Sequence, residues 1–202
     1  MSFPFAYWYA RIVELRIDVL LRPDELENEL DALYERLNQP ADPLFDLPAI
    51  DIEMPGFRFH HRVADGEHYI YVEDTVRRRL AGYTIFNRLV ELNRQSDRYL
   101  RAPHSKYALA YQRRGIAAAI YRWWLDGNRC LISGARQSAG ANALWRSLSN
   151  RYNLAFVDLR DKTLRYLGSQ VNEETLGSLH TRMILMGCGW DLNTLSSALK
   201  MR

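Results

Sequence analysis

One segment sets the architecture of this chain: Tyr107-Ala-Leu-Ala-Tyr-Gln-Arg-Arg-Gly-Ile-Ala-Ala-Ala-Ile-Tyr-Arg-Trp-Trp-Leu-Asp126. It starts as an apolar, strand-like run over 107–111 and then turns through 112–115. Apolar residues next recur at the spacing of one buried helix face, at Ile116, Ala119, Ile120 and Trp123. Gly127 follows where a left-handed helix cap is common. The segment therefore predicts a strand, a tight loop and a long amphipathic helix.

The loop has the features of a phosphate site. The first N–H groups of a helix have no partner inside the helix, and the helix dipole adds positive potential there. Gly115 has no Cβ, so an anion can approach its backbone closely, and Ala117 keeps the next turn small. Arg113 and Arg114 add positive charge. The alternative is an ordinary strand–helix connection with a capping glycine.

The residues Gln112-Arg-Arg-Gly-Ile-Ala117 resemble the pyrophosphate-binding signature of the GCN5-related N-acetyltransferases, Gln/Arg-x-x-Gly-x-Gly/Ala. The resemblance implies that acetyl-coenzyme A is the cofactor. It implies a pyrophosphate contact with Gln112, Arg113, Arg114, Gly115, Ile116 and Ala117. It also implies that the strand before the loop splays from its neighbour. The acyl arm would lie in that opening and pair with backbone groups of Leu109, Ala110 and Tyr111.

The remaining elements are predicted in the order that this family uses. Period-two alternation predicts a strand over 13–19, and a Leu/Tyr stripe predicts a helix over 23–37. Asp65-Gly66 between the strand-like runs 57–63 and 67–73 predicts a hairpin. Further strands are expected at 79–86, 98–109, 130–133, 154–158 and 163–167, and further helices at 138–148 and, as a pair split by Gly187-Cys-Gly189, from 172 onward.

This order predicts an α+β fold with a central, mostly antiparallel sheet flanked by helices, similar to the acyl-coenzyme A N-acyltransferases. The resemblance covers about residues 11–168, so we expect an acyltransferase-like domain over 1–168 and a C-terminal helical extension over 169–202. A length of 202 residues and a hydrophobic content of 48% suit one domain with a buried core.

Charge and cysteine content further limit the class of protein to which this chain could belong. The net charge is only +3, yet all but Lys106, Lys162 and Lys200 of the 27 basic residues are Arg. Two cysteines outside any CxxC or Cys/His cluster argue against a disulfide framework and against a metal site. The apolar N-terminus is interrupted by charges and lacks a cleavage signal. We expect a soluble cytoplasmic protein without a membrane segment.

The catalytic residues of the family are matched less closely than its pyrophosphate loop. The family often carries Asn-x-x-Ala-x-x-x-Tyr on a later helix, with Tyr as the acid, but this chain has Ser138 and Trp145 in that frame. Indole cannot protonate a thiolate. Tyr152 is a substitute acid, and His104 is a candidate base because its pKa is naturally near neutrality. The other candidate bases are Glu73, Glu91 and Asp97.

Two functions are therefore open. The first is an acetyl-coenzyme A-dependent N-acyltransferase that acts on an amine of unknown class, as a monomer or a homodimer. The second is a catalytically degenerate module that binds nucleic acid or an acidic partner through an Arg-rich face. The members of this face are Arg77, Arg78 and Arg79, with Arg88, Arg94, Arg98 and Arg101. Motifs for nucleotide hydrolysis and zinc proteolysis are absent from the sequence, and His60-His61 point to opposite faces of a strand.

Overall fold

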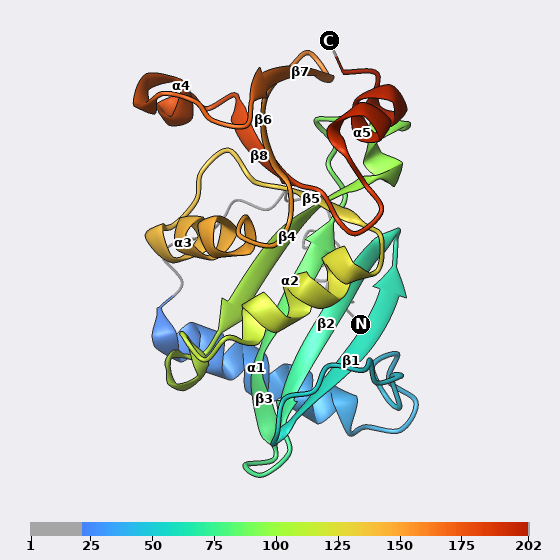
Figure 1. Cartoon of the computed structure of the whole chain (residues 1–202). Helices are drawn as coiled ribbons and strands as arrows, with labels where there is room; N and C mark the ends of the chain where they lie inside the picture. Colours follow the sequence, from blue (N-terminus) through green and yellow to red (C-terminus); the bar gives the residue numbers. More distant parts are fainter. Residues whose placement is uncertain (1–21, 202) are drawn as a thin grey trace, which may run out of the picture.

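The computed structural model describes residues 22–201, so the strand predicted over 13–19 lies outside the described residues. An eight-stranded sheet in the order β1-β2-β3-β4-β5-β8-β6-β7 runs through the molecule (Figure 1). Every neighbouring pair in it is antiparallel except β4 and β5. The predicted α+β fold with a mostly antiparallel sheet, flanking helices and a C-terminal helix is confirmed.

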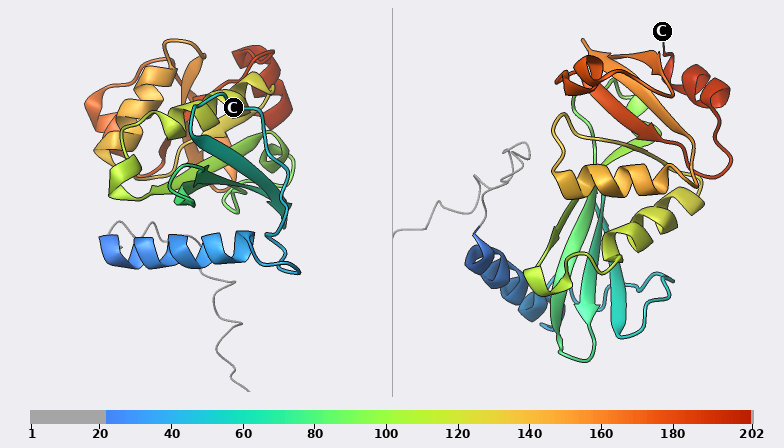
Figure 2. Two further views of the ribbon diagram at one scale, coloured as in Figure 1. Left: turned by 90° about the horizontal axis from the view of Figure 1, so that it is seen from below. Right: turned by 60° about the vertical axis from the view of Figure 1, so that its left-hand side comes forward.

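The strands are β1 Phe57–Ala64, β2 Glu67–Asp74, β3 Arg79–Asn87, β4 Leu100–Tyr107, β5 Cys130–Ile132, β6 Leu154–Arg160, β7 Thr163–Gly168 and β8 Thr181–Leu185. The helices are α1 Pro23–Leu37, α2 Ile116–Asp126, α3 Ala139–Leu148, α4 Glu173–Gly177 and α5 Leu192–Leu199. Helices α1 and α2 lie on opposite faces of β1–β4, as the turned views show (Figure 2). A second cluster of buried residues joins β5, β6 and β8 to α5.

The local signals explain these elements. Asp65 and Gly66 both have positive φ values, 54° and 79°, which a two-residue hairpin turn requires, and the predicted hairpin is confirmed. Helix α1 has Pro23 in its first turn and buries Leu30. Helix α3 is capped by Ser138, whose hydroxyl accepts the Ala141 N–H at 3.2 Å.

The buried face of α2 differs from the prediction by one residue. Trp124, rather than Trp123, is fully buried, at the i+4 and i+8 positions from Ile120 and Ile116. Trp123 lies at the edge of this face beside His61. The left-handed residue after the helix is Asn128 (φ 59°), whereas Gly127 has φ −80°.

The strand predicted to reach Tyr111 ends at Tyr107. Residues Leu109–Tyr111 form a 3₁₀ turn, in which the Tyr111 N–H donates to the Ala108 carbonyl at 2.8 Å. The physical reason is the Tyr111 ring, which is buried and whose hydroxyl donates to Asp74 at 2.9 Å. The chain must curl back toward the end of β2 to make this contact.

The tail predicted as two helices contains a strand. Thr181–Leu185 is β8, fully buried, and it lies between β5 and β6 in the sheet. The β-branched residues Thr181 and Ile184 favour a strand here, and the helices predicted from 172 onward did not take them into account. The segment after residue 168 therefore contributes to the same sheet as the predicted domain before it.

Two histidines of the β1–β2 hairpin pack under α2 and give the fold a pH dependence. The rings of His61 and His68 are stacked and share a hydrogen bond of 3.0 Å between Nε2 and Nδ1. Burial lowers the pKa of His61, and burial together with the charges of His61, Arg129 and Arg101 lowers the pKa of His68 to about 4. Both rings are therefore neutral in the folded protein at pH 7.

We expect the free energy of unfolding to fall as pH drops from about 6.5 toward 4, because the unfolded histidines bind protons there before the folded ones do. Partial exposure of the rings limits the loss from this pair to about 1 to 2 kcal/mol. Urea unfolding across this range measures it. The double variant His61→Gln, His68→Gln should show a flatter pH dependence, and an unchanged slope would contradict this assignment.

Candidate functional site

The loop between β4 and α2 has the backbone geometry of an anion site. Gly115 is the N-cap residue with φ 80°, and a Cβ built on it would meet no atom within 4 Å. The first helical hydrogen bond runs from the Ala119 N–H to the Gly115 carbonyl at 2.9 Å. The N–H groups of the residues between them therefore have no carbonyl partner within the helix. Donors without partners at a helix start, next to the open space at Gly115, are features that a phosphate site needs.

The loop is held by contacts that the sequence did not reveal. The Gln112 side chain donates from Nε2 to the Tyr107 carbonyl at 3.0 Å, which ties the loop to the end of β4. Tyr111 is anchored on Asp74, which also accepts the Arg77 N–H at 2.8 Å. Burial of Asp74 opposes its ionisation, but the hydrogen bonds from Arg77 and Tyr111 keep its pKa below the usual value. The conformation of the loop is thus fixed before any ligand binds.

An opening lies beside β4, where the two parallel strands diverge. β4 and β5 pair only at Leu100 with Cys130 and at Arg101 with Leu131. β4 continues to Tyr107 while remaining paired to β3 on its other side. Among the described residues, the edge of β4 from 102 to 107 therefore has no strand partner on the β5 side. At about 3.3 Å per residue this open edge is about 20 Å long. The pairing of the two strands thus ends after Arg101, as the predicted splaying requires.

Side chains of β4 alternate between the two faces of the sheet at this opening. Lys106 points to the α1 face, where its Nζ lies 3.2 Å from Glu29, which also accepts the Tyr83 hydroxyl at 2.6 Å. Ser105 and Tyr107 lie on the α2 face with Thr84, whose Oγ1 is 2.7 Å and 2.8 Å from their hydroxyl oxygens. The open edge is thus flanked by polar groups on both faces.

His104 is the predicted base that the structure brings to this edge. The pKa of His104 is lowered below its usual value, mainly by burial and secondly by the charge of Lys106. Within residues 22–201 its Nε2 is buried and has no hydrogen-bond partner. A neutral imidazole with an unpaired nitrogen can accept a proton.

The other three candidate bases are held by basic side chains away from this edge. Glu73 lies 2.8 Å from His60, and Glu91 lies 3.2 Å from Arg182. Asp97 accepts from Arg88 at 2.8 Å and from the Leu89 N–H at 3.1 Å. Each carboxylate therefore has a structural partner.

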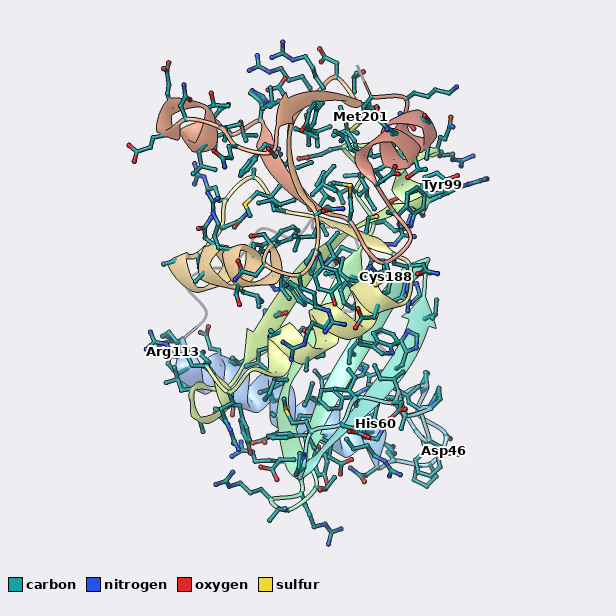
Figure 3. The ribbon with its side chains drawn as sticks, in the orientation of Figure 1. Asp46, His60, Tyr99, Arg113, Cys188 and Met201 are labelled. Carbon is teal, nitrogen blue, oxygen red and sulfur yellow. The ribbon has the colours of Figure 1, made fainter. Side chains whose placement is uncertain are left out.

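Tyr152 is not brought to the loop. Its hydroxyl donates at 2.7 Å to Asp126, which is the last residue of α2, whereas Gly115 precedes the first. The helix separates them by about 16 Å at 1.5 Å per residue. In Figure 3, Arg113 marks the loop end and Cys188, whose Sγ is 3.5 Å from Asp126, marks the other end. Burial and the Asp126 carboxylate raise the pKa of Tyr152.

Most of the predicted Arg-rich face is neutralised within the chain. Arg79 pairs with Glu27 and Asp31 of α1, and Arg77 pairs with Asp74. Arg88 and Arg101 both contact Asp97. These arginines join the elements of the fold, so they do not form one free basic surface.

Comparisons with known proteins found only distant likenesses. No protein-family model and no curated protein matches the chain. One similar solved structure is RimL, a ribosomal L7/L12 alpha-N-protein acetyltransferase in complex with coenzyme A, at 13% identity and a TM-score of 0.35. That match covers 59% of this chain, which spans 60% of the RimL chain.

A second similar structure is a chimera of the spermidine N-acetyltransferase SpeG from Vibrio cholerae and hSSAT. It has 18% identity and a TM-score of 0.35 over 67% of this chain and 70% of that one. A sister chimera has 17% identity with the same TM-score and coverage.

The described residues also bear on metals and membranes. Among residues 22–201, no three His, Cys, Asp or Glu side chains are grouped so that they could hold a metal ion. None of the helices described there is both long and apolar enough to cross a membrane.

Proposed function

We propose that this chain is an acyl-coenzyme A-dependent N-acyltransferase of the GCN5-related kind, with acetyl-coenzyme A as its cofactor. The observation that carries the proposal is the juxtaposition of a glycine-capped helix start and an open strand edge. The loop offers N–H donors without helical partners and open space at Gly115, where a Cβ would meet no atom within 4 Å. Arg113 and Arg114 add positive charge, so these residues fit a pyrophosphate.

The residues at the site have separate roles. Residues 112–117 would hold the pyrophosphate through backbone N–H groups. Leu109, Ala110 and Tyr111 form a 3₁₀ turn, so their backbone is not extended for pairing. The acyl arm would instead pair with the backbone of the open edge of β4, which precedes them. They would border that arm as contacts. Bound acetyl-coenzyme A would supply an activated thioester carbonyl for attack by the acceptor amine.

His104 would accept the proton that the attacking amine loses. Its imidazole is neutral at pH 7 and its Nε2 is unpaired in the described chain. The departing thiolate needs a proton as well, and water supplies it in this proposal because Tyr152 is held by Asp126 at the far end of α2. Trp145, buried in α3, has no acidic proton to give.

The degenerate binding module has less support. It requires a free basic face. Most of the positive charge of that face is neutralised by ion pairs within the chain, which involve Arg77, Arg79, Arg88 and Arg101. A steep fall of nucleic-acid binding with salt would revive it.

Calorimetric titration with acetyl-coenzyme A tests the cofactor, with desulfo-coenzyme A as a control for binding without a reactive thioester. Micromolar binding of both ligands is expected. Binding of neither would mean that the loop is only a strand–helix connection.

We expect His104→Gln to lower turnover by about 100-fold while leaving acetyl-coenzyme A affinity unchanged. Thiol release from acetyl-coenzyme A across a panel of primary amines measures it. The wild-type rate should fall as pH drops below 6.5 toward the lowered pKa of His104, because protonation removes the base. This acid limb should vanish in the variant.

The matched control is His60→Gln, which removes an imidazole paired with Glu73 on the hairpin. It should leave both the rate and its acid limb intact. If the two variants behave alike, His104 is not the base.

A further inference from the structure

A pair of guanidinium groups flanks one aromatic ring beside the phosphate loop. The Arg77 guanidinium carbon lies 5.9 Å from the centre of the Tyr111 ring, and that of Arg114 lies 5.6 Å from the same centre. Arg114 also lies 5.2 Å from the Phe57 ring, which meets Tyr111 edge to face. The turn between β2 and β3 and the loop before α2, far apart in sequence, thus bring two cations to one place.

The ring that gathers these cations is rigidly held. Tyr111 is buried and its hydroxyl donates to Asp74, which also accepts a 3.1 Å hydrogen bond from the Arg77 side chain. The Arg77 side chain is nevertheless 62% exposed, and only one of its nitrogens contacts Asp74. A guanidinium has five N–H donors in a fixed fork, so the others can bind a second anion.

The charge balance at this ring leaves room for an anion. In the described part of the chain, Arg114 stacks on aromatic rings but has no carboxylate partner. Arg77 and Arg114 are thus two cations at a ring whose hydroxyl is bonded to the single carboxylate of Asp74. Arg114 directly precedes Gly115, so these cations adjoin the proposed pyrophosphate cradle.

Coenzyme A carries a third phosphate, a monoester on its ribose, next to its pyrophosphate. A phosphate monoester has a charge of about −1.5 to −2 at pH 7 and three acceptor oxygens, which suit paired Arg forks. We propose that Arg77 and Arg114 form a second phosphate subsite, which binds this 3′-phosphate and lets the chain distinguish coenzyme A from dephospho-coenzyme A. This inference rests on the proposed function.

Calorimetry with coenzyme A and dephospho-coenzyme A tests the subsite. The wild-type chain is expected to bind coenzyme A about 10- to 100-fold more tightly, the range of one or two charge-assisted contacts. Arg77→Gln should weaken coenzyme A binding about tenfold and leave dephospho-coenzyme A binding unchanged. Arg114→Gln should weaken coenzyme A binding more than dephospho-coenzyme A binding, because Arg114 also adds charge at the pyrophosphate. The double variant should bind both ligands equally.

Arg78→Gln is the matched control. Arg78 lies in the same turn, has φ 55° and is exposed, so its replacement removes the same charge without touching Tyr111. It should leave the ratio of the two affinities unchanged. A lower ratio of coenzyme A affinity to dephospho-coenzyme A affinity in this variant would mean that net charge, and not the subsite, discriminates between the two ligands.

The failures are distinguishable. Equal wild-type affinity for both ligands would overturn the subsite while the proposed function stands. If Arg77→Gln or Arg114→Gln weakened the binding of both ligands equally, the replaced residue would only stabilise the loop and would not bind the 3′-phosphate. Binding of neither ligand by the wild-type chain would overturn the proposed function itself.

Discussion

Gly115→Glu is expected to abolish binding of acetyl-coenzyme A, with a loss of about 1,000-fold or more. The new carboxylate would occupy the open space in front of the helix start and repel the pyrophosphate there. It would also force a side chain into a left-handed backbone (φ 80°), which costs about 1 to 2 kcal/mol. Calorimetric titration measures the loss, and thermal unfolding shows whether the fold survives.

Two controls separate the causes. Gly115→Ala carries the backbone strain without the charge, so it should bind far better than the glutamate variant. Gly140→Glu adds the same charge in the first turn of α3, where a Cβ would also meet no atom within 4 Å, and it should bind as the wild type does. Wild-type affinity in Gly115→Glu would remove the loop from the proposed function.

Trp124→Ala is expected to lower the free energy of unfolding by about 3 to 5 kcal/mol. The indole is 2% exposed and stacks on Phe86 at 4.1 Å between ring centres. His68 meets it edge to face at 4.8 Å, and the Arg129 guanidinium lies 4.1 Å from its ring centre. The substitution would leave a cavity where α2 meets the sheet, and urea unfolding measures the loss.

The neighbouring Trp123→Ala provides the control. Trp123 is only partly buried and lies against His61 and Arg129 at the edge of the same helix. We expect it to cost about 1 to 2 kcal/mol, in proportion to the smaller apolar area that it buries. Equal losses of stability in the two variants would contradict the deeper burial of Trp124.

The elements that were predictable are those with strong local signals. The hairpin at Asp65-Gly66 depends on two residues that tolerate positive φ, and α1 depends on a proline start followed by an apolar stripe. The loop 112–117 depends on the position of one glycine. Each of these signals lies within a few residues, so the sequence carries it without knowledge of the tertiary structure.

The misplaced elements depend on distant contacts. The turn at Leu109–Tyr111 exists because the Tyr111 hydroxyl reaches Asp74, 37 positions away, and no local pattern records that contact. The strand at Thr181–Leu185 is short and fully buried, and periodicity cannot separate such a run from a buried helix. The contacts of Tyr152 likewise follow from packing against the end of α2.

The position of β8 has a consequence for how the molecule is made. During synthesis β5 and the β6–β7 hairpin emerge from the ribosome well before β8, which later joins them in the middle of the sheet. Until then the nascent chain presents unpaired edges on β5 and β6, the kind of surface on which strands of other chains assemble. Among the strands of residues 22–201, the one that is translated last thus closes the sheet, and its arrival covers the edges that are most exposed to aggregation.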